Sequence, residues 1–177
     1  MKIKATTILC LTGIFFIMTS CGKTESADTF DIGALTSFEL TSSDLHDGVW
    51  DTIITNTDNG SNVSPQLSWE PVKGADSYVI YMIDTSAGNW LHWKSNGVTE
   101  TELPQGWAPA GEYIGPYPPG GTHDYEVYVF AVEKPATEIG GEFDAENKDF
   151  EAVAKQLDED GHIVGCGRVA GSYTKGD

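Results

Sequence analysis

Apolar and polar residues follow the short period of β-strands over most of the chain. Ser77 to Asp84 (SYVIYMID) is rich in Val, Ile and Tyr, and Tyr125 to Glu133 alternates between apolar and polar side chains. Because successive side chains of a strand point to opposite faces, both runs predict strands of a largely buried sheet. Further strands are predicted at Phe38–Leu40, Gln66–Trp69, Leu91–Ser95 and His162–Ala170. Glycines in the last of these indicate a β-bulge.

One segment near the C-terminus has the longer period of a helix. Apolar side chains recur there at i, i+3, i+4 and i+7, at Phe150, Val153, Ala154 and Leu157. The spacing predicts a helix over residues 144–159, with Asp144 capping its start and Gly161 following its end. The predicted fold class is therefore mostly β, with an antiparallel sheet and one clear helix late in the chain.

The N-terminal segment has the pattern of an export signal. Lys2 and Lys4 precede an uncharged apolar run, Thr6 to Met18, which is shorter than the roughly 20 residues needed to span a bilayer. A basic start, a short apolar run and small residues after it are typical of a secretory signal peptide. Met18 to Gly22 (MTSCG) then resembles a bacterial lipobox, in which the cysteine becomes the first mature residue and carries lipid.

The chain is accordingly expected to have three parts. We predict a lipoprotein signal peptide at 1–20, a flexible tether at 21–34 and a single domain at 35–177. Cys21 is the predicted lipidation site; the alternative is a plain signal peptide cut nearby, with Cys21 uninvolved. The expected location is the bacterial cell envelope, outside the cytoplasm, with the membrane reached through the lipid anchor.

Charge and cysteine content narrow the possible functions. The formal net charge is −17 at pH 7, which argues against nucleic acid as a partner and against electrostatic docking on anionic lipid. Of the three cysteines only Cys166 lies in the predicted domain, so no disulfide is expected there. It sits in an apolar stretch, IVGCGRV, where we expect a buried structural thiol rather than a nucleophile.

A rigid loop before a strand carries the strongest functional signal. The stretch GPYPPGGTHDY, Gly115 to Tyr125, combines prolines, which fix φ and lack an N–H, with glycines, which allow close backbone approach. His123 and Tyr125 stand at i and i+2, on one face of the predicted strand. Asp84 ends an earlier strand, and His92 follows it within NWLHW. We expect these side chains to meet at one rim and hold a small ligand; each histidine taken alone is more typical of ordinary packing.

Four blocks of the chain together carry a family resemblance. They are GSNVSPQLSW (60–69), MIDTSAGNWLHW (82–93), GPYPPGGTHDY (115–125) and IVGCGRVAGSY (163–173). In order and spacing they resemble the phosphatidylethanolamine-binding proteins, also called Raf kinase inhibitor-like proteins, and in particular the bacterial branch. The third block is the most specific, since it matches the pattern G-P-x-P-P-x-G-x-H-R-Y.

The resemblance implies both a fold and a site. The implied fold has a central antiparallel sheet, a smaller second sheet and one or two helices near the C-terminus, with an anion pocket at one edge of the main sheet. The pocket residues that it implies are Asp84, Trp90, His92, Gly115, Pro119, His123 and Tyr125. The chain departs from the family pattern where Thr85 and Ser86 follow Asp84, and where Asp124 replaces an arginine.

The implied ligands are small anions, namely phosphate esters or phospholipid headgroups, with no cofactor and no metal. Imidazoles can donate hydrogen bonds to a phosphate, protonation near pH 6.5 strengthens such bonds, and N–H groups of a glycine-rich loop add fixed donors. Such local donors would have to bind an anion against the repulsion from the net negative charge of the chain.

Two other readings of the sequence remain open. Leu67 to Thr85 (LSWEPVKGADSYVIYMIDT) also resembles fibronectin type III strands, which would make the protein an adhesion or spacer module without a pocket. Alternatively, Asp84, His92 and His123 could serve a metal-dependent hydrolase. The chain contains no HExxH motif and no nucleophile elbow, so an enzyme is not the expected function.

Overall fold

The computed structural model describes residues 30–176, which form two β-sheets, one α-helix and three short 3-10 helices. The main sheet has the strand order β3-β4-β10-β9-β6-β7, with β1 also paired to β10. Its strands are β1 (Ser37–Phe38), β3 (Leu45–His46), β4 (Val49–Trp50), β6 (Ser77–Asp84), β7 (Trp90–Val98), β9 (Thr122–Val132) and β10 (Ile163–Thr174). The smaller sheet consists of β2 (Leu40–Thr41), β5 (Leu67–Trp69) and β8 (Glu102–Leu103). The helices are α1 (Phe150–Gly161), η1 (Ile32–Ala34), η2 (Thr52–Ile54) and η3 (Thr85–Ala87).

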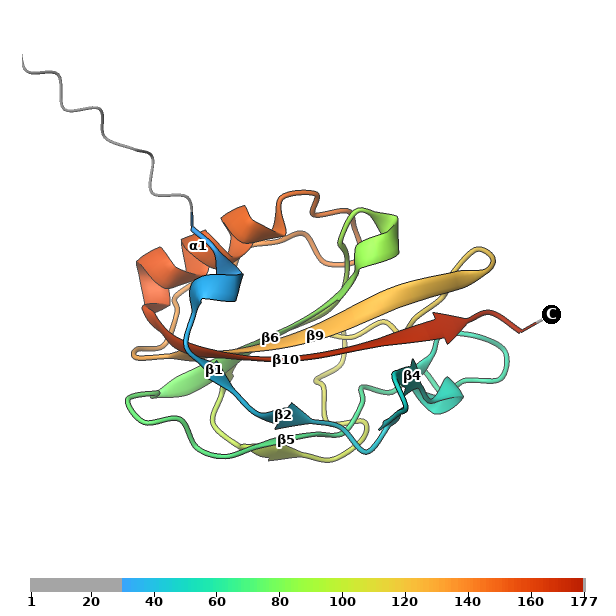
Figure 1. The fold of residues 1–177 in the computed structure, drawn as a ribbon, viewed down its shortest axis with the longest axis horizontal. Helices are drawn as coiled ribbons and strands as arrows, with labels where there is room; N and C mark the ends of the chain where they lie inside the picture. The colour runs from blue at the N-terminus through green and yellow to red at the C-terminus, as the bar shows by residue number, and fades with distance from the viewer. Residues whose placement is uncertain (1–29, 177) are drawn as a thin grey trace, which may run out of the picture.

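The main sheet lies between two layers, with α1 on one face and the small sheet on the other (Figure 1). Strand β6 shows why its sequence is apolar throughout. Val79, Tyr81 and Ile83 pack in the core beneath α1, whereas Ile80 and Met82 pack toward the small sheet. A strand buried on both faces needs apolar residues at every position rather than at alternate ones. The predicted fold class, a mostly β protein with two sheets and a C-terminal helix, is therefore confirmed.

The helix begins later than the sequence pattern indicates. It starts at Phe150, and Asp149 caps it by accepting a hydrogen bond from the Ala152 N–H at 3.0 Å. The predicted cap Asp144 instead lies in a loop with φ of 56°. Its carboxylate accepts a hydrogen bond from the Trp90 indole N–H at 3.0 Å. Because an aspartate can cap a helix or accept bonds in a turn equally well, the sequence did not separate these two roles.

The long strands match the predicted ones closely. Strand β6 has the predicted bounds, and β9 begins at Thr122, so that His123 and Tyr125 both lie within it. The register of β10 against β9 shifts between Ile163 and Gly165, which confirms the predicted bulge. The fibronectin type III alternative is wrong, because a helix covers one face of a seven-stranded sheet that includes parallel pairs.

Two loops cover the outer edge of β7. The N–H of Lys94 donates to the carbonyl of Glu112 at 3.0 Å, and the N–H of Ile114 donates to the carbonyl of His92 at 2.8 Å. Farther along the strand, Leu91 exchanges backbone hydrogen bonds of 2.9 Å with the loop residues Ala145 and Asp144. The edge strand nearest the candidate site is therefore paired on both sides.

The described chain begins with residues assigned above to the tether. Phe30, Ile32 and Leu35 pack against the core beneath α1, and the N–H of Ile32 donates to Glu151 at 3.0 Å. The last part of the predicted tether thus lies on the domain. The predicted signal peptide and Cys21 lie outside the described residues. Of the helices within residues 30–176, none has the length and apolar character needed to cross a bilayer.

Cys166 lies buried in β10, as expected of a structural thiol. Burial raises the pKa of Cys166 to about 12, an effect that the positive charge of Arg168 opposes in part. At pH 8 we expect Cys166 of the folded protein to react with iodoacetamide about 100-fold more slowly than in the urea-unfolded chain, because only the thiolate is the nucleophile. Peptide mass spectrometry would follow this cysteine separately from the others. Equal rates in the two states would contradict the structural role.

Candidate functional site

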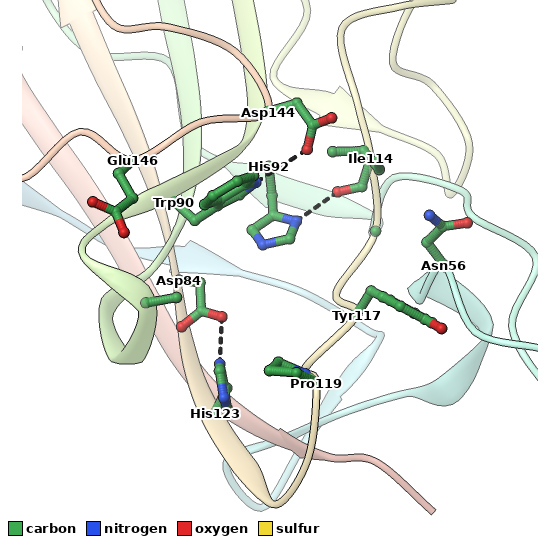
Figure 2. A pocket seen from close by; sticks show the side chains of 12 residues that line it. Asn56, Asp84, Trp90, His92, Ile114, Tyr117, Pro119, His123, Asp144 and Glu146 are labelled. Atoms are coloured by element: carbon green, nitrogen blue, oxygen red, sulfur yellow. Dashed lines mark hydrogen bonds and ion pairs between the residues drawn. The ribbon is translucent and has the colours of Figure 1, made fainter.

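A cavity of about 370 Å³ opens where β6 ends and β7 and β9 begin, beside the Pro/Gly-rich loop. Six of the seven predicted site residues line it (Figure 2): Asp84, Trp90, His92, Gly115, Pro119 and His123. The other lining residues, which the sequence analysis did not identify, are Asn56, Ala87, Ile114, Tyr117, Asp144 and Glu146. The expected convergence of side chains from separate strands and loops is therefore present in the structure.

Asp84 and His123 form the closest polar contact in the cavity. The Nδ1 atom of His123 lies 2.6 Å from Oδ2 of Asp84, and the two side chains are 15% and 4% exposed. Strand pairing explains the contact, because β6 and β9 are antiparallel neighbours with Asp84 opposite Tyr125. A carboxylate bound to Nδ1 fixes the orientation of the ring and leaves Nε2 for a ligand.

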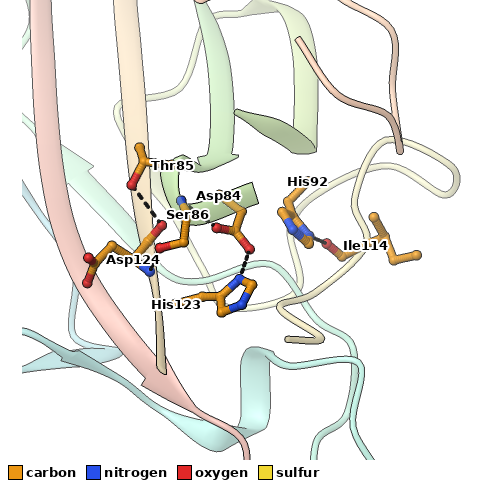
Figure 3. Close-up of polar contacts among 7 residues, drawn as sticks. All are labelled: Asp84, Thr85, Ser86, His92, Ile114, His123 and Asp124. Atoms are coloured by element: carbon orange, nitrogen blue, oxygen red, sulfur yellow. Dashed lines mark hydrogen bonds and ion pairs between the residues drawn. The ribbon is translucent and has the colours of Figure 1, made fainter. Parts of the chain in front are cut away.

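Three residues that differ from the family pattern hold this pair in place (Figure 3). Ser86 donates its N–H to Oδ1 of Asp84 at 2.9 Å and accepts the Asp124 N–H on its hydroxyl at 3.0 Å. The Thr85 hydroxyl donates to the Asp124 carbonyl at 3.2 Å. The short helix η3 is thereby attached to the start of β9, and both oxygens of Asp84 are occupied.

His92 is held by the loop on the opposite side of the cavity. Its Nδ1 lies 2.8 Å from the carbonyl oxygen of Ile114, and its side chain is buried. Burial lowers the pKa of His92, while the Ile114 carbonyl and the negative charges of Asp84 and Asp144 oppose that shift. Since a carbonyl can only accept, Nδ1 carries the proton of the neutral ring. Figure 2 shows the other ring nitrogen facing the space above Pro119.

Tyr125 is the one predicted site residue that does not line the cavity. Its ring lies behind the two imidazoles, 5.3 Å from that of His92 and 6.4 Å from that of His123 between centroids. Burial and the charge of Asp84 raise the pKa of Tyr125, and its buried hydroxyl makes no hydrogen bond to another described residue. Its spacing of two residues from His123 correctly predicted that both side chains lie on one face of β9. At Tyr125, however, this face is covered by the core and is not open to the cavity.

At Gly115 and Pro119 the glycine-rich loop does not supply the N–H donors that the sequence led us to expect. The N–H of Gly115 is already bonded to Oδ1 of Asn62 at 2.7 Å, and Pro119 has no N–H. Gly115 is instead needed for close packing, because a Cβ there would lie 2.2 Å from the carbonyl oxygen of Ile54. The loop therefore shapes the wall of the cavity rather than offering its backbone amide at this position.

The rim of the cavity is acidic. Asp144 and Glu146 line it together with Asp84, and no lysine or arginine is among the lining residues. Asp144 is fixed by the indole of Trp90, and a β-bridge joins Trp90 to Glu146. The helix predicted over residues 144–159 included Asp144 and Glu146, so the sequence analysis missed their contribution to the site. The pairing of WLHW with a later acidic loop was not visible in the sequence.

A metal centre finds no support among the described residues. Within residues 30–176 no group of three or more His, Cys, Asp or Glu side chains is arranged to hold a metal ion. Asp84, which the hydrolase alternative requires as a ligand, already accepts bonds from His123 and Ser86.

Comparisons with known proteins agree with one another on the family and the fold. The family profile described as phosphatidylethanolamine-binding protein matches residues 41–174. A relative from Methanothermobacter thermautotrophicus, named UPF0098 protein, is 31% identical over 142 residues, which is 68% of this chain and 88% of that protein.

Two solved structures share the fold. One is a phosphatidylethanolamine-binding protein homologue from Chlamydia trachomatis, with a TM-score of 0.58 and 23% identity, covering 80% of this chain and 99% of that one. The other is YbcL of E. coli, described as a new member of the mammalian phosphatidylethanolamine-binding protein family. It has a TM-score of 0.60 and 20% identity, and the match covers 80% of this chain and 100% of that one.

Proposed function

The chain belongs to the phosphatidylethanolamine-binding protein family, and from this premise we propose that it binds a small anionic ligand in the cavity between Asp84, His92 and His123. The ligand class is a phosphate ester or a phospholipid headgroup. The observation that carries the proposal is that two imidazoles from different strands line one cavity, each held through Nδ1 by a fixed acceptor. This arrangement leaves two Nε2 atoms and an apolar wall for the ligand.

The proposal includes attachment to the cell envelope through lipid on Cys21. It is supported by the lipobox-like residues that follow the apolar N-terminal run. A tether between Cys21 and the domain would keep the cavity close to a membrane, where phospholipid headgroups are abundant. Mass spectrometry of the protein isolated from its native membrane tests this part: an N-terminal diacylglyceryl-cysteine at Cys21 is expected, and an unmodified cysteine would contradict it.

Binding itself can be tested with methyl phosphate as the probe and the four histidines as reporters. His92 and His123 line the cavity, whereas His46 and His162 have exposed side chains on β3 and after α1. We expect methyl phosphate to shift the imidazole NMR signals of His92 and His123 in the full-length chain and to leave the other two unchanged. Shifts in none of the four, or equal shifts in all four, would contradict binding in this cavity.

A further inference from the structure

The ring nitrogen that His92 presents to the cavity is a hydrogen-bond acceptor. A neutral imidazole carries one N–H, and the 2.8 Å contact with the Ile114 carbonyl requires that N–H on Nδ1. Nε2 therefore holds a lone pair. Burial lowers the pKa of His92, which favours this neutral form. An unprotonated Nε2 repels the oxygen of a fully ionised phosphate instead of binding it.

The carboxylates around His92 add to the repulsion of a fully ionised phosphate, although their charges oppose the effect of burial on the pKa of His92. Asp84 approaches from β6, Asp144 and Glu146 from the loop before α1, and His123 from β9, with the Tyr125 phenol behind them. Among the lining residues the only cationic groups available are the imidazoles themselves.

Two of the N–H donors at the cavity are already used. The Trp90 indole donates to Asp144, and the Gly115 amide donates to Asn62. Asn56 and Tyr117 also line the cavity and can donate from their side chains. Beside His92, however, the lining carboxylates and Nε2 are acceptors, so a ligand that reaches Nε2 is best matched when it brings a donor of its own.

We propose that the cavity selects a phosphate monoester in its singly protonated form, with the P–OH group donating to Nε2 of His92. This inference rests on the proposed function and narrows its ligand class to monoesters, which leaves out headgroups whose phosphate is a diester. The ester keeps its proton and no covalent bond changes. A dianionic ester would need to take up one proton on binding, and a diester, which has no P–OH, would leave Nε2 without a partner.

A pair of matched ligands tests the proposal by calorimetry on the full-length chain. Methyl phosphate and methyl sulfate have nearly the same shape, and at pH 5.5 both carry about one negative charge, because the second pKa of a phosphate monoester is about 6. They differ by one ionisable proton. We expect methyl phosphate to bind about tenfold more tightly or better, since a donor meets the buried acceptor only in that ligand.

The pH dependence supplies a second readout. Above the second pKa of the ester, the affinity for methyl phosphate should fall about tenfold per pH unit, as the protonated fraction does. Methylphosphonate, which loses its second proton at higher pH, should keep its affinity to correspondingly higher pH. A decline at the same pH for both ligands would place the critical proton on the protein and overturn the proposal.

Two variants show whether His92 is the acceptor. In His92→Asn the amide nitrogen lies near the position of Nδ1 and can keep the bond to the Ile114 carbonyl, while nothing remains at the position of Nε2. The preference of this variant for methyl phosphate over methyl sulfate should therefore disappear. The Asp144→Asn variant loses one negative charge but keeps His92. It should bind methyl phosphate and methyl sulfate more tightly than the unaltered chain and still prefer methyl phosphate. Circular dichroism checks the fold, and if His92→Asn does not fold, the ligand pair on the unaltered chain still decides.

Failure of anion binding and failure of the selection for a protonated ester give different results. If neither methyl phosphate nor methylphosphonate binds, the proposed function itself is wrong. If methyl phosphate and methyl sulfate bind equally well, the anion site stands and the selection for a protonated ester is wrong.

Discussion

Replacing His123 by Asn is expected to weaken binding of methyl phosphate by about 10- to 150-fold, because it removes Nε2 from the cavity together with a charge-assisted hydrogen bond. The amide nitrogen of Asn lies near the position of Nδ1 in His, so the donor to Asp84 is kept. This makes His123→Asn a better test than His123→Ala, which would leave the buried Asp84 with only the Ser86 N–H. Calorimetry at pH 5.5 measures the affinity.

A matched control is available for this variant. His162 is also a histidine with carboxylates nearby, but its side chain is 63% exposed. His162→Asn should bind methyl phosphate as the unaltered chain does. If His123→Asn keeps full affinity while its unfolding curve is unchanged, His123 does not belong to the binding site.

Replacing Gly115 by Ala is expected to lower the free energy of unfolding by about 3 kcal/mol or more. The added Cβ would lie 2.2 Å from the Ile54 carbonyl oxygen and 2.7 Å from the Asn56 nitrogen. Both are backbone atoms, so no side-chain rotation can relieve the overlap. The loop would have to move away from the segment after η2, which also disturbs the wall of the cavity.

Gly120 provides the control for this second experiment. It lies in the same loop, and a Cβ there would meet nothing within 4 Å. Urea unfolding of the two variants should show a clear loss of stability for Gly115→Ala and a change within about 0.5 kcal/mol for Gly120→Ala. Equal stability of both variants would show that the packing of this loop against residues 54–56 is not required.

The sequence predicted the features of this fold that depend on local periodicity. The bounds of β6 follow from a run rich in Val, Ile and Tyr, the bulge in β10 from its glycines, and the apolar face of α1 from the helical spacing. The resemblance to known family motifs then brought Asp84, His92 and His123 together, and the structure places all three around one cavity. Spacing by itself does not show which strand ends meet.

What could not be predicted depends on long-range pairing. The acceptor for Nδ1 of His92 is a backbone carbonyl 22 residues away, so no side chain in the sequence marks it. The partner of the Gly115 amide is 53 residues earlier, in a loop with no strong pattern. Asp144 was predicted to cap the helix. Its hydrogen bond with the Trp90 indole depends on the folded chain bringing β7 next to the acidic loop, and the sequence does not show this.

The covered edge of β7 links the integrity of the site to the solubility of the protein. The two loops that pair with this strand also contribute Ile114 and Asp144 to the cavity. A change that detaches either loop would therefore uncover backbone N–H and carbonyl groups along an apolar strand, which is a template for intermolecular sheet formation. Substitutions at these positions would therefore carry two costs, namely self-association of the chain and loss of ligand binding.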